Sequence, residues 1–179
     1  MGKILGYIIA VICLWAFSGF ADAGVLMPAY NGTPYFQAYR STAATPSIGV
    51  LGKVLFDTKS FDSGGYYDNA TNYRYTPLLT GKYLVHVHLG VQPTVTAGTQ
   101  TANIVAIYKN GVSLTSVRQD LYISGTTAIG AIDCTAIVPM NGTTDYVEGW
   151  GECSTGSGCS FLGGTAPLGS FFEAFYLGP

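Results

Sequence analysis

Residues 82–91 alternate between large apolar side chains and other side chains, and this period of two constrains the fold more than any other feature. A β-strand would place every second residue on one face: Tyr83, Val85, Val87, Leu89 and Val91. Leu84, His86 and His88 would occupy the opposite face. No window after Ala23 keeps a helical period, and abundant Gly, Thr, Ser, Tyr and Val favour strands and turns. The sequence therefore predicts an all-β protein.

The dipeptide Asn110-Gly111 separates two β-type segments, 102–109 and 112–123, and is a strong signal for a tight hairpin. Further strands are predicted at residues 35–41, 49–57, 73–77, 82–91, 127–140, 145–151 and 170–177. Residues 42–48, 58–71 and 92–100 are rich in turn formers, and we expect loops there. The pattern predicts one antiparallel jelly-roll β-sandwich of about nine or ten strands, with no second domain.

The first 23 residues have the features of a secretory signal peptide. A short basic start is followed by an apolar run and by Ala21-Asp22-Ala23, a small-x-small cleavage pattern. The alternative is an uncleaved membrane anchor, but the apolar run is shorter than the roughly 20 residues that span a bilayer. We expect cleavage, no stable membrane insertion afterwards, an extended arm at residues 24–33, and one folded domain at residues 34–179.

Charge is sparse and gives no support to a nucleic-acid partner. Only 10% of residues are charged, the formal net charge is −2 at pH 7, and no basic cluster is present. Binding to a phosphate backbone depends on clustered Lys and Arg. A surface of Thr, Ser, Asn, Gly and Tyr suits an extracellular particle or a protein partly covered by neighbours.

Cysteine usage agrees with export. Cys153 and Cys159 lie in a Gly- and Ser-rich segment whose backbone can bend enough for the two residues to meet. We expect a disulfide between them in an oxidising compartment, and the alternative is two free thiols. Cys134 falls on the apolar side of an alternating strand, where a buried, unpaired thiol is expected.

Two predicted strands are apolar on both faces, which points to self-association. In residues 104–108 and again in residues 171–177, apolar side chains fall on the odd and the even positions alike. An antiparallel sheet normally leaves one face in water, so such strands need a second cover. Another copy of the chain would supply it. The candidate interface residues from this argument are Val105, Ile107, Phe171 and Phe175.

The histidines, His86 and His88, have two open interpretations. Neighbouring imidazoles on one strand face could ligate a metal or sense pH. Alternatively, they are polar side chains hydrogen-bonded to neighbours or water. Asp57, Asp62 and Asp68 present a similar choice between calcium binding and capping of local turns. No arrangement of nucleophile, base and acid is recognisable, so we predict no enzyme activity and no cofactor.

Several short motifs, taken in order, resemble one known family: Phe56, Tyr67-Asp68, Tyr75, Gly81-x-Tyr83 and Asn110-Gly111. The family is the globular head of complement subcomponent q (C-one-q-like), structural kin of tumour necrosis factor. Its phage and bacterial variants look closer still, because Ala38-Tyr39-Arg40-Ser41 and residues 53–57 and 171–177 also fit. The resemblance spans residues 34–178. It implies a trimeric jelly roll in which the strand of His86 and His88 lies near the symmetry axis, so both are candidate interface residues.

Together these observations predict a secreted, non-enzymatic, homotrimeric recognition or structural module. It would bind a protein or glycan on a surface by avidity, through loops 58–71, 92–100 and 151–167. The expected location is extracellular, with the periplasm or a virion surface as further possibilities. The alternative function is a phage virion component, such as a tail-fibre tip or a capsid decoration protein.

Overall fold

The computed structural model describes residues 32–93, 99–123, 129–154, 158–164 and 169–179. The chain divides into two units, Met1–Asn31 and Gly32–Pro179, and only the second falls within the described residues. The predicted signal peptide and nearly all of the predicted arm lie outside them. In the part that is described, no helix has the length and apolar character needed to cross a membrane.

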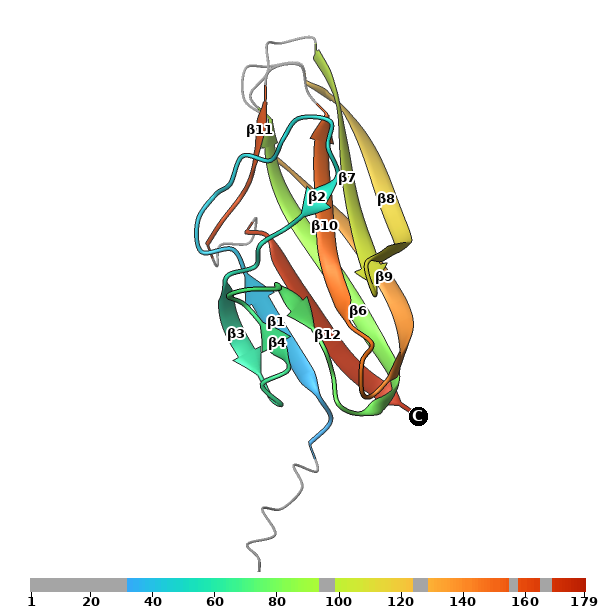
Figure 1. Ribbon diagram of the computed structural model, residues 1–179. Coiled ribbons are helices and arrows are strands. Elements are labelled where there is room, and N and C mark those ends of the chain that lie inside the picture. Colours follow the sequence, from blue (N-terminus) through green and yellow to red (C-terminus); the bar gives the residue numbers. More distant parts are fainter. Residues whose placement is uncertain (1–31, 94–98, 124–128, 155–157, 165–168) are drawn as a thin grey trace, which may run out of the picture. The chain divides into compact units, whose positions relative to one another are not determined.

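The described residues form an all-β sandwich of two antiparallel sheets (Figure 1). The first sheet contains β1 (Tyr35–Tyr39), β3 (Thr58–Asp62), β6 (Thr80–Pro93), β9 (Gly130–Asn141), β11 (Cys159–Phe161) and β12 (Phe171–Gly178). The second sheet contains β2 (Gly52–Lys53), β4 (Tyr67–Asp68), β5 (Arg74–Tyr75), β7 (Thr99–Lys109), β8 (Val112–Ile123) and β10 (Val147–Ser154). The predicted antiparallel sandwich is confirmed.

Strand β6 is the central strand that joins most of the first sheet. It pairs with β9 along one edge and with β12 and β11 along the other. The alternation seen in the sequence is the alternation of burial: Tyr83, Val85 and Val87 are fully buried, as are the next two residues of that face. His86 and His88 point to the opposite, outer face and are only partly buried.

The core contains a group of stacked aromatic rings. The ring of Phe36 on β1 lies 4.7 Å from that of Tyr67, 4.3 Å from that of Tyr75 and 4.9 Å from that of Phe172, measured between centroids. All four side chains are at most 2% exposed. Aromatic pairs at these distances add to the stabilisation from burial itself. Tyr67 and Tyr75, whose motifs belong to the family resemblance, are therefore packing residues.

The Asn110-Gly111 turn joins β7 to β8 as predicted. Both residues have positive φ angles, 53° and 78°, the conformation that a type I′ hairpin turn needs. The Asn110 side chain also binds the neighbouring loop: its Oδ1 accepts from the backbone N–H of Tyr146 at 2.9 Å, and its Nδ2 donates to Asp145 at 2.8 Å. These bonds connect the hairpin to the start of β10.

The predicted boundaries were wrong where strands are very short. Of the predicted strand 49–57, only Gly52–Lys53 pairs, as β2 against β10. The predicted loop 58–71 contains β3 and β4, and the predicted loop 151–167 contains β11. These short strands depend on partners far away in the chain, β3 on β1 and β11 on β6, so their local sequence carries little signal.

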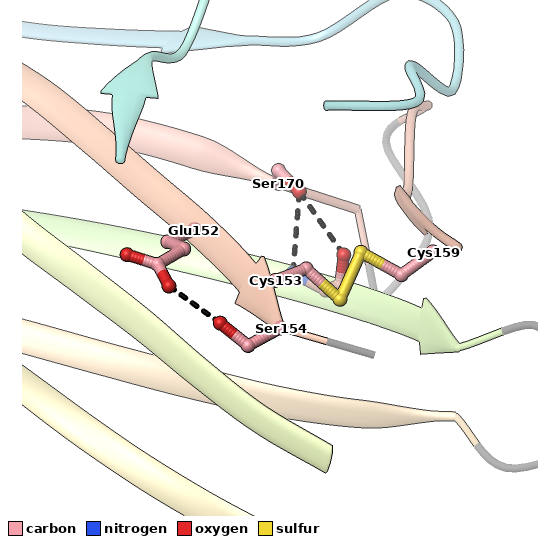
Figure 2. Close-up of a disulfide and its surroundings, with 6 residues drawn as sticks. Glu152, Cys153, Ser154, Cys159 and Ser170 are labelled. Atoms are coloured by element: carbon pink, nitrogen blue, oxygen red, sulfur yellow. Dashed lines mark hydrogen bonds between the residues drawn. A yellow bond between two sulfur atoms is a disulfide. The ribbon is translucent and has the colours of Figure 1, made fainter. Parts of the chain in front are cut away.

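The Cys153–Cys159 disulfide is present and joins the end of β10 to β11 (Figure 2). Ser170, close by, is fully buried, and its hydroxyl bonds both the N–H and the C=O of Gly90 at 3.2 and 3.4 Å. Cys134 is a buried free thiol, as predicted. The disulfide thus joins the end of β10 to the beginning of β11, close to the hydrogen bonds that connect β6 to the residue before β12.

Replacing both Cys153 and Cys159 by alanine should lower the free energy of unfolding by about 2 kcal/mol, the value expected for releasing a short closed loop. Urea unfolding followed by circular dichroism measures the loss. Mass spectrometry of the unreduced wild type should find the two cysteines in one linked peptide. A double variant as stable as the wild type would contradict a stabilising role for this bond.

Candidate functional site

Strand register gathers two adjoining groups of side chains on the outer face of the first sheet. The first, here called the histidine cluster, comes from β1, β6, β9 and β12: Gln37, His86, His88, Asp133 and Glu173. The second, here called the apolar patch, comes from the same strands and β3: Tyr35, Phe61, Leu84, Ile137 and Phe175. Residues far apart in the chain meet because their strands are neighbours in the sheet.

His86 lies between two carboxylates. Its Nδ1 is 3.1 Å from Oε1 of Glu173, and its Nε2 is 2.9 Å from Oδ1 of Asp133. Ionised carboxylates only accept hydrogen bonds, so both contacts together require a proton on each ring nitrogen. Gln37 holds Glu173 in place by donating from Nε2 to the other carboxylate oxygen at 2.8 Å. The arrangement favours the charged imidazolium form of His86.

His88 shares the same acid. Its Nδ1 is 2.7 Å from Oδ1 of Asp133, the oxygen that also contacts His86. Its ring stacks on Phe171, with centroids 4.8 Å apart and planes at 15°. Within the described structure, Nε2 of His88 is buried and has no hydrogen-bond partner. Asp133 therefore links the two imidazoles from the neighbouring strand.

The pKa values follow from this geometry. The hydrogen bond to Glu173 raises the pKa of His86 most, and the bond to Asp133 adds to it, while burial opposes both. Burial alone would raise the pKa of Asp133 and of Glu173, but the hydrogen bonds that each accepts outweigh it and lower both pKa values. The cluster is thus a positively charged ring held by two ionised acids.

The apolar patch is unusually exposed for its composition. Tyr35 and Phe61 are 38% and 37% exposed, and Ile137 is 61% exposed. The ring of Tyr35 lies 5.5 Å from that of Phe61 and 6.5 Å from that of Phe175, so the aromatic members form one continuous surface. Adjoining apolar side chains of this kind commonly mark interaction surfaces.

The prediction that Val105 and Ile107 contact a second copy is wrong. Both are fully buried in the hydrophobic core of a single subunit. Apolar residues occupy both faces of β7, and an alternating pattern does not say which face turns inward. On the outward face Tyr108 stacks on Trp150, with centroids 4.3 Å apart, so the subunit partly covers this face itself.

The other four predicted interface residues lie on the outer face of the first sheet. His86, His88, Phe171 and Phe175 are partly buried there and do not belong to the core. Their contact with another copy stays a prediction. The outward position of Phe171 and Phe175 on β12 is compatible with that prediction, whereas the two candidates on β7 lie in the core.

Asp133 and Glu173 are members of the cluster that the sequence did not reveal. Each lies far from the histidines in the chain, and register alone places Asp133 opposite His88 and Glu173 opposite His86. The sequence signal that could have indicated them is the presence of one acidic residue within each of two largely apolar strands, Asp133 in β9 and Glu173 in β12. The second interpretation of the histidines, as side chains hydrogen-bonded to neighbours, is confirmed.

Nothing in the described residues points to a metal centre. They contain no group of three or more His, Cys, Asp or Glu side chains arranged to hold a metal ion. Asp62 and Asp68 each accept backbone N–H groups from residues two to five positions further on, and Asp57 accepts from the N–H of Ser41 at 2.7 Å. Asp62 and Asp68 thus cap local turns, whereas Asp57 connects to Ser41, 16 residues earlier in the chain.

Comparison with known proteins supports the fold. No protein-family model and no curated protein sequence matches the chain. Among solved structures, the globular domain of zebrafish complement 1qA protein matches at a TM-score of 0.50 and 16% identity, over 82% of this chain and 98% of that one. Eiger TNF from S. frugiperda matches at 0.52 and 13%, over 81% and 91%. Murine APRIL at pH 5.0 matches at 0.55 and 11%, over 82% and 100%.

These likenesses show a jelly roll of the C-one-q-like and tumour-necrosis-factor-like type, which confirms the predicted fold. At such low identity they show the fold alone. The nearer resemblance to phage and bacterial variants of the family stays a prediction.

The histidine cluster should make stability depend on pH in a defined direction. Because the folded pKa of His86 is raised, its contribution is present below its ordinary pKa of about 6.5 and is lost as the pH rises through the raised value. The contributions of Asp133 and Glu173, whose pKa values are lowered, are present above about pH 4 to 5 and are lost on acidification. The cluster should therefore stabilise most at about pH 5 to 6.

His86→Gln tests this. The wild type should lose about 1 kcal/mol more stability than the variant between pH 5.5 and pH 8.5, a value reduced for partial solvent exposure. Urea unfolding at one fixed protein concentration measures the difference. Asp133→Asn, which leaves the ring without one acid, should give a similarly flattened profile. Identical pH profiles for the wild type and His86→Gln would show that the ring does not titrate as described.

Proposed function

We propose that this chain is a secreted, non-enzymatic recognition module that works as a homotrimer, with the outer face of the first sheet at the subunit interface. The observation that carries the proposal is the exposed apolar patch beside the histidine cluster on a sheet face that the subunit leaves open. The similarity to complement and tumour-necrosis-factor-type folds supports the number three.

A second surface suits the other side of such an interface. In a closed ring of three, each subunit uses two different surfaces, because the contacts run head to tail. Strand β8 is at the edge of the second sheet and, among the described strands, pairs only with β7. It exposes Val112, Leu114, Val117 and Tyr122. Long exposed edge strands with apolar side chains are usually covered in native proteins. We propose that β8 of one subunit contacts the apolar patch of the next.

The charges of the histidine cluster are compatible with burial at this interface. Removing an isolated charge from water is expensive, but each charged member of the cluster already has a partner within 3.1 Å. Desolvation in the assembly would strengthen these contacts as it lowers the local dielectric constant. The cluster would then fix the orientation of the subunits, while the apolar patch supplies most of the association free energy.

Recognition would come from the loops and from repetition. Three identical weak sites on one rigid head bind a repetitive surface much more strongly than one site does. The candidate loops are residues 58–71, 92–100 and 151–167, and residues 94–98, 155–157 and 165–167 of these lie outside the described structure. The hydrogen bonds of both imidazoles within the described residues go to carboxylates, so catalysis by a histidine-activated nucleophile has no support.

The oligomeric state tests the proposal directly. Light scattering coupled to size exclusion should give three times the subunit mass for the wild type. Ile137→Asp places a charge in the apolar patch and should shift the protein to monomer at micromolar concentration. Ile48→Asp is the matched control, since Ile48 is also an exposed isoleucine, 49% against 61%, and lies outside the patch. A monomeric wild type, or a trimeric Ile137→Asp variant, would contradict the interface.

Secretion has its own test. Expression of the full chain in a bacterial host with N-terminal sequencing of the periplasmic and medium fractions should find a mature protein that begins at Gly24. Recovery of chains that keep Met1, within assembled virus particles and not in the exported fractions, would instead favour the virion component.

A further inference from the structure

A cavity of about 240 Å³ lies apart from the histidine cluster, between the segment that connects β1 to β2 and strands β10 and β11. Its walls are mostly apolar and include Val50, Leu55 and Phe161. Gly52 lies at the wall with open space beside it: a side chain there would meet nothing closer than the carbonyl oxygen of Val50 at 4.0 Å. Apolar walls with few polar groups are the usual construction of small-molecule sites.

A buried cation lines the cavity, and one of its hydrogen-bond donors has no partner among the described residues. Arg40 lines it and is only 8% exposed. Its Nη1 donates to the carbonyl oxygen of Leu55 at 2.8 Å, but its Nε is buried with no hydrogen-bond partner among the described residues. No ion pair between described residues includes Arg40. A buried donor without a partner is costly, so a ligand oxygen that bonded to this Nε would be favoured.

Asp57 is the acid whose negative charge acts on Arg40: it opposes the lowering of the Arg40 pKa by burial, and Arg40 in turn helps to lower the pKa of Asp57, but no ion pair joins the two side chains. Asp57 uses its carboxylate to accept from the N–H and hydroxyl of Ser41 and from Thr58. Lys53 also lines the cavity, but its ammonium group is 2.6 Å from Glu148 and donates to a backbone carbonyl. At this cavity, Nε of Arg40 is therefore the buried donor that a ligand oxygen could satisfy.

The walls are held in place before any ligand arrives. Ala44 bridges to Phe161 of β11, and the N–H of Gly49 donates to the carbonyl of Cys153 on β10 at 3.0 Å. The disulfide then joins Cys153 to Cys159, two residues from Phe161 (Figure 2). A preformed site loses less conformational entropy on binding than one that must be ordered.

We propose that this cavity binds a small organic monocarboxylate, with the carboxylate on Arg40 and a short apolar tail against Val50, Leu55 and Phe161. A planar guanidinium matches a carboxylate through paired N–H donors. The volume equals about eight water molecules at roughly 30 Å³ each, which suits a ligand of about six to ten non-hydrogen atoms. The site lies within one subunit and goes beyond the proposed function, so it does not depend on trimer formation.

Benzoate is the test ligand, with benzamide as its neutral match. Two-dimensional NMR of the ¹⁵N-labelled mature protein should show saturable shifts confined to residues 44–55 and their β10 and β11 neighbours, with a dissociation constant of about 0.1 to 5 mM. Benzamide should bind at least about tenfold more weakly, since it lacks the charge. No saturable shift with benzoate up to about 20 mM, or equal affinity for the two compounds, would overturn the proposal.

Two substitutions at Gly52 distinguish blocking of the cavity from a general effect of mutation on the protein. Gly52→Leu should fill the cavity and abolish benzoate binding, while Gly52→Ala, the matched control, should keep the affinity within about threefold. Arg40→Gln should also abolish binding. Binding retained in a folded Gly52→Leu or Arg40→Gln protein would overturn the assignment, and the comparison of benzoate with benzamide needs no variant if either fails to fold. Loss of the trimer with retained benzoate binding would reject the proposed function alone.

Discussion

The pairing of β12 between β1 and β6 is the constraint on which the rest of the structure depends. Its register turns Phe172 and Ala174 into the core, where the ring of Phe172 completes the aromatic group around Phe36. The same register turns Glu173 outward, opposite His86 on one side and Gln37 on the other. A shift by one residue would exchange these faces, so packing of the core and assembly of the outer surface are fixed together.

The outer face combines two kinds of interaction that serve different purposes. In the proposed trimer the apolar patch would supply association free energy with little directional preference, because the hydrophobic effect is non-directional and roughly proportional to the apolar area buried. The histidine cluster contributes direction, because its hydrogen bonds require defined geometry and a defined protonation state. This protonation state is the charged imidazolium form of His86, since the ring can donate to both Glu173 and Asp133 only when both of its nitrogens carry a proton. An interface built in this way would be specific as well as stable.

The end of the sandwich near the disulfide has a different character. Here the segment between β1 and β2, the ends of β10 and β11, and the start of β12 are joined by hydrogen bonds, one isolated bridge and one covalent bond. Arg40, with its backbone N–H bonded to the carbonyl of Ser170 at 3.1 Å, belongs to this network, yet Nε of its side chain has no hydrogen-bond partner among the described residues. A rigid framework around a buried donor without a partner is compatible with the ligand site proposed above.

The sequence by itself determined the fold class, the buried face of β6, the hairpin at Asn110-Gly111, and the disulfide, because each rests on neighbours in the chain: alternation, turn preference and short loop closure. Its predictions were wrong for the boundaries of the short strands and for the inward face of β7, and it did not reveal the acids around His86. Only the tertiary structure decided these. Register brings Asp133 and Glu173 to the histidines from strands about 45 and 87 residues away, and burial of Val105 depends on which side of the sheet meets the other. Register and the buried face are determined by the free energy of pairing and packing between strands that are distant in the sequence, and a local pattern does not contain that information.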